Sequence, residues 1–129
     1  MIGYKIVYKY KDKLYSYNNM IYSDEYLEKV LKRGDSVEYK LNEVTFPLEG
    51  CGPLSVFTNL KAVKIFTEND DDERYFIYRC EYEPADTRLI WCLETRFKSS
   101  IEFHMPGTDG ISNIDYTTAK WVKLLELIE

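Results

Sequence analysis

The sequence predicts a single α+β domain, 1–129, in which a mainly antiparallel, twisted sheet of five to eight strands carries two helices. Three observations support this class. The chain has 129 residues, the size of one domain. Most of it divides into stretches that alternate apolar and polar residues with the period of a strand. Two stretches instead have the apolar spacing and the end signals of helices.

The first strand is expected at residues 2–10. One face carries Ile2, Tyr4, Ile6, Tyr8 and Tyr10, and the other carries Lys5, Val7 and Lys9. A nucleic-acid-stacking surface needs aromatic and cationic side chains together. Because they separate here, we expect the tyrosine face to pack on the core. A turn at 11–13 then leads into a short returning strand at 14–17.

Two helices are expected. The first begins at Ser23-Asp24, buries Tyr26, Leu27, Val30 and Leu31, and ends before Gly34. The second is capped by Thr58 and buries Leu60, Val63 and Phe66. Short strands at 37–41, 44–46 and 54–57 are expected between these helices, with Pro47 ending the middle one.

The second half of the chain predicts a hairpin of 75–83 with 88–97. The register that keeps apolar residues together places Phe76, Tyr78, Cys80 and Tyr82 on one face with Leu89, Trp91 and Leu93. This register puts Cys80 and Cys92 on opposite faces, which argues against a disulfide. A further strand is expected at 101–105. The pattern of 119–128 fits either a helix or a strand.

Composition excludes several classes of protein. With 45% hydrophobic and 16% aromatic residues the chain is not disordered. It contains no apolar run long enough to cross a membrane, and its first residues lack the apolar core of a signal peptide. We therefore expect a cytoplasmic protein, or one in the host cytoplasm if it is viral. The net charge of −5 disfavours binding to nucleic acid or to anionic membranes.

Few residues suggest chemistry. The three cysteines have no CxxC spacing and there is one histidine, so we expect no metal site and no cofactor. The loop Gly50-Cys51-Gly52-Pro53 favours a tight turn, with a reactive thiol as the alternative. His104 lies near a loop, and Glu81 and Glu83 form a carboxylate pair; with Cys51 and Gly52 they make a candidate ligand site. The acidic run 68–73 lacks the glycine of a calcium loop.

Several segments carry a resemblance to a known group of domains. They are Tyr39 and Asn42, Thr45-Phe46-Pro47, Gly52 to Phe57, Ala62 and Phe66, Pro106-Gly107-Thr108, and Val122-Lys123-Leu124. Together they resemble small uncharacterised α+β domains of phages, plasmids and prokaryotic genomes. The resemblance implies that the last segment is a strand. It also suggests a distant similarity to ADP-ribosyltransferase-like folds, whose Glu-x-Glu motif would correspond to Glu81-Tyr82-Glu83, although no matching Arg or Ser-Thr-Ser motif accompanies it.

We therefore predict a small non-enzymatic protein-interaction domain, encoded by a virus or mobile element. Twelve tyrosines exceed what a core of this size needs, and tyrosine is favoured at interfaces. Tyr15, Tyr17 and Tyr22 are the candidate interface residues. The expected partner is another protein, with a second copy of the chain as a further candidate. The alternative is a degenerate ADP-ribosyltransferase-like enzyme or a small-ligand binder.

Overall fold

The computed structural model describes residues 1–16, 24–32, 36–67, 75–91, 98–101, 111–112 and 114–129. Its strands are β1 (Ile2–Tyr10), β2 (Lys13–Ser16), β3 (Glu38–Tyr39), β4 (Val44–Thr45), β5 (Leu54–Phe57), β6 (Tyr75–Pro84), β7 (Leu89–Ile90), β8 (Ser99–Ser100) and β9 (Tyr116–Leu127). Its helices are α1 (Asp24–Lys32) and α2 (Leu60–Thr67). The ladders between these strands are antiparallel, so the predicted α+β class is confirmed.

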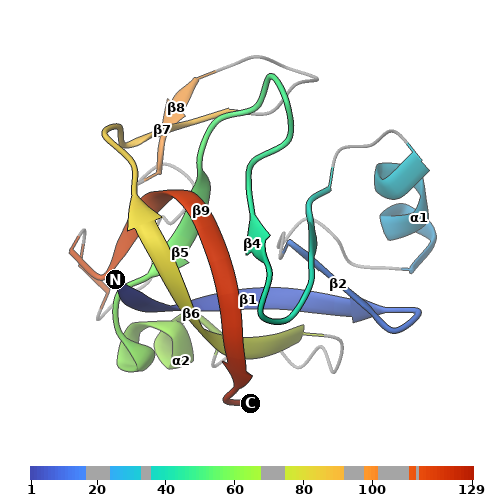
Figure 1. Cartoon of the computed structure of the whole chain (residues 1–129), viewed down its shortest axis with the longest axis horizontal. Helices are drawn as coiled ribbons and strands as arrows, with labels where there is room; N and C mark the ends of the chain where they lie inside the picture. The colour runs from blue at the N-terminus through green and yellow to red at the C-terminus, as the bar shows by residue number, and fades with distance from the viewer. Residues whose placement is uncertain (17–23, 33–35, 68–74, 92–97, 102–110, 113) are drawn as a thin grey trace.

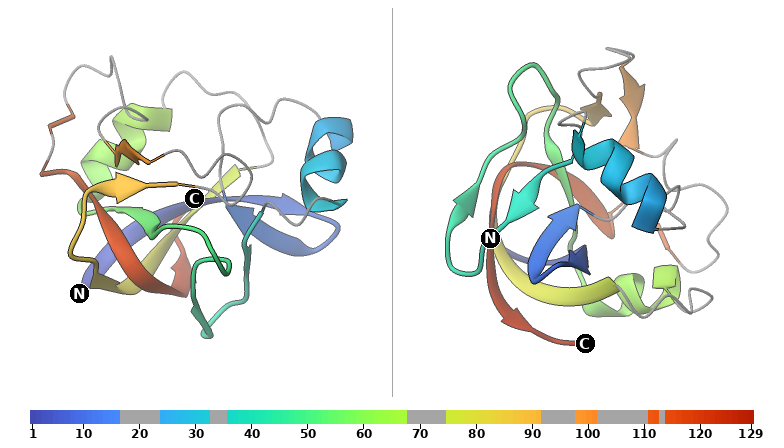
Figure 2. Two further views of the ribbon diagram at one scale, coloured as in Figure 1. Left: turned by 90° about the horizontal axis from the view of Figure 1, so that it is seen from above. Right: turned by 90° about the vertical axis from the view of Figure 1, so that its right-hand side faces the viewer.

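Four strands of the main sheet close into a small barrel. β1 pairs with β6, β6 with β9, β9 with β5, and β5 again with β1. Beyond this ring, β2 and β3 extend the sheet from β1, and β4 pairs with β9. The strands visibly curl around one another instead of lying flat (Figure 2).

The curl of β9 is helped by two β-bulges. Its register with β6 shifts between Arg79 and Cys80 and again between Glu83 and Pro84. Leu125 and Lys120 are the extra residues that these shifts leave on β9. A bulge bends its strand and increases the local twist. The long β9 can therefore contact β6, β5 and β4 in turn.

The barrel interior holds the largest apolar cluster. Its buried members are Val7, Tyr39, Leu54, Val56, Cys80, Tyr82, Ala119, Val122 and Leu124. The predicted common face of Phe76, Tyr78, Cys80 and Tyr82 is correct, since all four pack in or against this cluster. Glycine at position 3 makes room here, because a Cβ atom there would lie 2.6 Å from the Phe57 carbonyl oxygen.

The two helices cover the outside of the sheet at opposite ends (Figure 1). α1 buries Leu27 against Tyr8, and α2 buries Ala62 and Val63 against Ile6 and its neighbours. The tyrosine face of β1 therefore packs under the helices as predicted. The opposite face of β1, which carries Lys5 and Val7, is buried too, because it lines the barrel.

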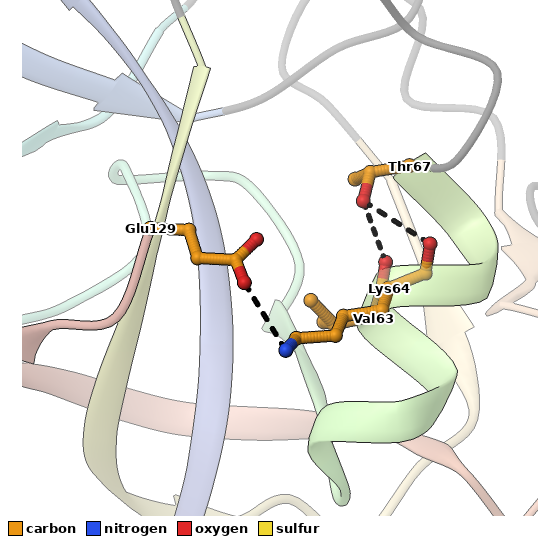
Figure 3. A network of polar contacts seen from close by, with 4 residues as sticks. All are labelled: Val63, Lys64, Thr67 and Glu129. Carbon is orange, nitrogen blue, oxygen red and sulfur yellow. Dashed lines mark hydrogen bonds and ion pairs between the residues drawn. The ribbon is translucent and has the colours of Figure 1, made fainter.

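The cap of α2 differs from the prediction by one residue. Asn59 Oδ1, not Thr58, accepts the hydrogen bond from the Ala62 N–H, at 2.8 Å. Thr58 instead donates its hydroxyl hydrogen to the Ile114 carbonyl. At the other end, the Thr67 hydroxyl bonds back to the Val63 carbonyl, and Lys64 Nζ lies 3.1 Å from Glu129 Oε1 (Figure 3).

The predicted hairpin of 75–83 with 88–97 is wrong. β6 pairs with β1 along one edge and with β9 along the other. Both partners are long strands that supply more ladder than a local hairpin would. The described part of 88–97 instead forms β7, which pairs with β8.

Other predicted elements are close to those observed. Lys11 and Asp12 both have positive φ, which is typical of the two-residue turn that joins β1 and β2. The segment 119–128, whose pattern fits either a helix or a strand, belongs to strand β9 as far as Leu127. β8 ends just before the strand expected at 101–105, most of which lies outside the described residues, as do Gly34, Cys92 and Leu93.

Candidate interaction surface

The glycine-rich loop before β5 is a structural turn. The Cys51 N–H donates to the Leu48 carbonyl at 2.9 Å, and Gly50 has φ 80° at the third position of this turn. A positive φ at that position favours glycine. The loop therefore has the tight turn that its composition predicts.

Gly52 has a different role from Gly50. A Cβ atom at Gly52 would lie 2.5 Å from Cε3 of Trp91, so the indole packs directly on the glycine backbone. The Gly52 N–H donates to the Trp91 carbonyl at 2.9 Å, and Trp91 Nε1 donates to the Gly50 carbonyl at 3.2 Å. The prediction that Trp91 shares a sheet face with Cys80 is therefore wrong.

The candidate ligand residues divide between this loop and the outside of β6. Cys80 and Tyr82 point into the barrel. Glu81 and Glu83 alternate with them along β6, so they point outward, and both are exposed. Ala119 of β9 has a register partner on each side. One is Leu54, which follows the Cys51 loop, and the other is Pro84, which follows Glu83. β9 therefore separates the loop from the carboxylates. His104 lies outside the described residues.

The tyrosines of the described residues form no exposed aromatic surface. Tyr15 is buried, with 9% of its surface exposed, and Tyr17 and Tyr22 lie outside the described residues. Every tyrosine in the described part of the chain is at least half-buried. Tyr15 therefore offers little area to a partner.

Eight large apolar side chains of the described residues are exposed, and two of them, Val44 and Phe46, lie in or next to β4. Phe46 is 62% exposed and Val44 is 45% exposed. Val44 pairs with Lys123 of β9, so the two share the outer face of the sheet. Phe46, two positions after Val44, continues on that face towards Trp121. We call the surface made by Val44, Phe46, Trp121, Lys123, Glu81 and Glu83 the β4–β9 face.

The charges on and beside the β4–β9 face compensate one another. Glu83 accepts a hydrogen bond from Trp121 Nε1 at 2.9 Å, and the two residues are register partners. Lys123 likewise stands opposite Glu81. Further along the same ladder between β6 and β9, Arg79 Nε lies 2.6 Å from Glu126 Oε1. The face is thus an apolar and aromatic surface that carries one basic and two acidic side chains, a small excess of negative charge.

Two members of this face, Glu81 and Glu83, were predicted from the sequence as part of a ligand site and not as an interaction surface. The sequence also predicted a strand at 44–46 but assigned it no exposed surface. The missing information was the neighbour of that strand, since only the pairing with β9 places Val44 and Trp121 on one outer face. The sequence did contain one local indication of an exposed edge: the apolar strand ends at Pro47, and proline in a sheet is typical of edge strands.

A second group of polar residues lies inside the barrel. Lys5 is buried, its Nζ donates to the Ser55 carbonyl at 2.5 Å, and it stands 5.5 Å from the centre of the Tyr39 ring. Burial lowers the pKa of Lys5 to about 8 and raises the pKa of the nearby Cys80 thiol to about 11. Burial also raises the pKa of Tyr39, whose hydroxyl lies near Ser16 but completes no hydrogen bond within the described residues.

Within the described ranges, no three His, Cys, Asp or Glu residues gather as metal ligands would. No helix in that part of the chain has the length and apolar character needed to cross a bilayer. Comparison with known proteins gives no match among family models, curated proteins or solved structures.

Proposed function

We propose that this protein is a non-enzymatic interaction domain that binds another protein through the β4–β9 face. The observation that carries the proposal is the exposure of Phe46 and Val44 beside Trp121. Large aromatic side chains at the centre of a surface, with polar groups around them, are typical of protein interfaces. Trp121 adds a rigid ring of large area, held by its hydrogen bond to Glu83.

The balance of charge favours a protein partner over nucleic acid. Nucleic-acid binding needs unpaired Lys and Arg that can neutralise phosphates. Here Arg79 pairs with Glu126, and Lys123 faces Glu81. The chain as a whole carries a net charge of −5. A partner with an apolar centre and a few charges of both signs suits this face better.

The edge of β4 gives the partner a further means of binding. β4 pairs with β9 on one side and, within the described residues, with no strand on the other. An exposed edge offers backbone N–H and C=O groups to an added strand. A partner in extended conformation could therefore pair with β4 and contact Phe46 and Val44 with its side chains.

Affinity capture from the native host tests the proposal. The bait is the full chain, compared with Phe46→Asp and Trp121→Ala. The matched control is Ile114→Asp, because Ile114 is more exposed than Phe46 but lies before the start of β9, where its carbonyl bonds to Thr58. The proposal expects a set of partners that both face variants lose and the control keeps. Identical capture by all four baits would contradict it.

Light scattering across micromolar concentrations distinguishes a second copy of the chain from a different protein. The proposal expects a monomer, with partners recovered in the capture. A dimer that Phe46→Asp dissociates would instead make the β4–β9 face a self-association surface. That result would overturn the assignment to a different partner.

A further inference from the structure

The four seams of the barrel differ in length. β1 pairs with β6 from Ile2 to Tyr8, and β6 pairs with β9 from Tyr78 to Pro84. Between β1 and β5, in contrast, the described ladder consists of Tyr4 with Phe57. Backbone hydrogen bonds therefore hold this seam much less than the others. It is the place where the barrel can open with the smallest loss of sheet.

Besides the apolar packing of Val7 with Leu54 and Val56, a side-chain hydrogen bond spans the short seam. Lys5 lies next to Tyr4 on β1, and its Nζ reaches the Ser55 carbonyl, two residues before Phe57 on β5. The amine can donate this bond whether it is charged or neutral, because a neutral amine keeps two N–H groups. The Lys5 side chain lies inside the barrel, and its bond to the Ser55 carbonyl is partly buried.

We propose that Lys5 is a conformational latch: its bond to the Ser55 carbonyl holds the β1–β5 seam closed, and its release opens the barrel there without unfolding the rest of the sheet. The open state exposes the interior that β1 and β5 cover. Gly3 supports the closed state, because its missing Cβ lets the Phe57 carbonyl approach β1.

Cys80 is a natural reporter of this opening. It faces the barrel interior, pairs with Gly3 across the β1–β6 ladder and is fully buried. Its raised pKa keeps the thiol protonated in the closed barrel, whereas reaction requires the thiolate to attack a sulfur of the disulfide reagent and release the reagent's other thiol. Labelling of Cys80 under native conditions therefore requires that the barrel open.

The experiment uses the full chain with Cys51→Ser and Cys92→Ser, which leaves Cys80 as its one thiol. Labelling of Cys80 by a disulfide reagent is timed in the native state, and global unfolding is measured by denaturant titration. Lys5→Met removes the bond to Ser55 but keeps an apolar chain of similar length. We expect Lys5→Met to raise the labelling rate of Cys80 about ten- to a hundredfold more than it raises the equilibrium constant for global unfolding.

Lys9→Met is the matched control, since Lys9 lies on the same strand but is exposed. It should leave both measurements unchanged. If Lys5→Met changes labelling only in proportion to the global unfolding constant, Lys5 is no latch and the proposal fails.

A measurement on the unmodified protein keeps the proposal testable if Lys5→Met does not fold. Amide hydrogen exchange should show a partial opening in which the amides that bond β1 to β5 exchange well before the amides of β6 that bond to β9. Exchange of both strands only through global unfolding would overturn the proposal.

Discussion

The indole of Trp91 lies directly on the backbone of Gly52, and no side chain can occupy the space between them. A Cβ atom at position 52 would come within 2.5 Å of Trp91 Cε3 and 2.7 Å of Cδ2. Gly52→Ala must therefore displace the ring, and we expect it to lower the free energy of unfolding by about 1–3 kcal/mol. Denaturant titration measures this change.

A double-mutant cycle identifies the cause. In a Trp91→Ala background the space is vacant, so Gly52→Ala should cost much less there. Gly3→Ala is the matched control: its cost comes from the Phe57 carbonyl and the Tyr82 ring, not from Trp91, and should be the same in both backgrounds. Equal costs of Gly52→Ala with and without the indole would contradict the packing account.

The contact of Trp91 with Gly52 also shows where prediction from sequence stops. Alternation correctly assigned the common face of Tyr78, Cys80 and Tyr82, because parity along a strand depends on the strand itself. It could not identify the neighbouring strand. The local hairpin of 75–83 with 88–97 was the simplest pairing, but β6 lies between β1 and β9, one from each end of the chain.

The candidate surface depends on the same long-range information. Val44 and Phe46 were expected in a strand, and Trp121 in an undecided segment. Their place on one outer face of the sheet follows from the ladder between β4 and β9. The twelve tyrosines were misleading because a phenol ring can pack in a core while its hydroxyl reaches the margin. Tyr8, Tyr39 and Tyr82 are accordingly buried.

The cap of α2 leads to a second prediction. Asn59 Oδ1 accepts from the Ala62 N–H, so Asn59→Ala should lower the free energy of unfolding by about 1 kcal/mol. Asn59→Ser also loses the bond to Asp115 but keeps an acceptor for the helix, and it should recover most of that loss. Thermal unfolding of the two variants makes the comparison. Equal loss in both would assign the effect to Asp115 instead of the cap.

The exposure of Phe46 leads to a third prediction. Phe46→Ala removes a whole ring but should change the free energy of unfolding by less than about 1 kcal/mol, because the ring is mostly in water. Val56→Ala removes far fewer atoms from the barrel interior and should cost about 2 kcal/mol. Chemical denaturation of both proteins tests the order. A larger loss for Phe46→Ala would mean that Phe46 stabilises the folded domain. The exposure of Phe46 would then no longer support the β4–β9 face as a binding surface.

The buried Lys5 leads to a fourth prediction, on pH. Desolvation lowers its pKa from 10.5 to about 8 in the folded chain, so above pH 8 the unfolded chain binds more protons than the folded one. The free energy of unfolding should therefore rise with pH, by about 1 kcal/mol between pH 8 and pH 9. The cost of burying the ammonium is present in full below pH 8 and disappears above about pH 10.5.

Cys80 limits the window in which this rise can be seen. Burial raises its pKa from 9 to about 11, so near and above pH 9 the unfolded chain loses the thiol proton first, and this loss offsets the rise from Lys5. Urea titrations at pH 8.0, 8.5 and 9.0 therefore cover the range in which the Lys5 contribution is the larger of the two. Lys5→Met should abolish the rise, whereas Lys9→Met should keep it because Lys9 is exposed. A rise that persists in Lys5→Met would show that another group titrates in this range and that the Lys5 amine holds its proton in the closed barrel.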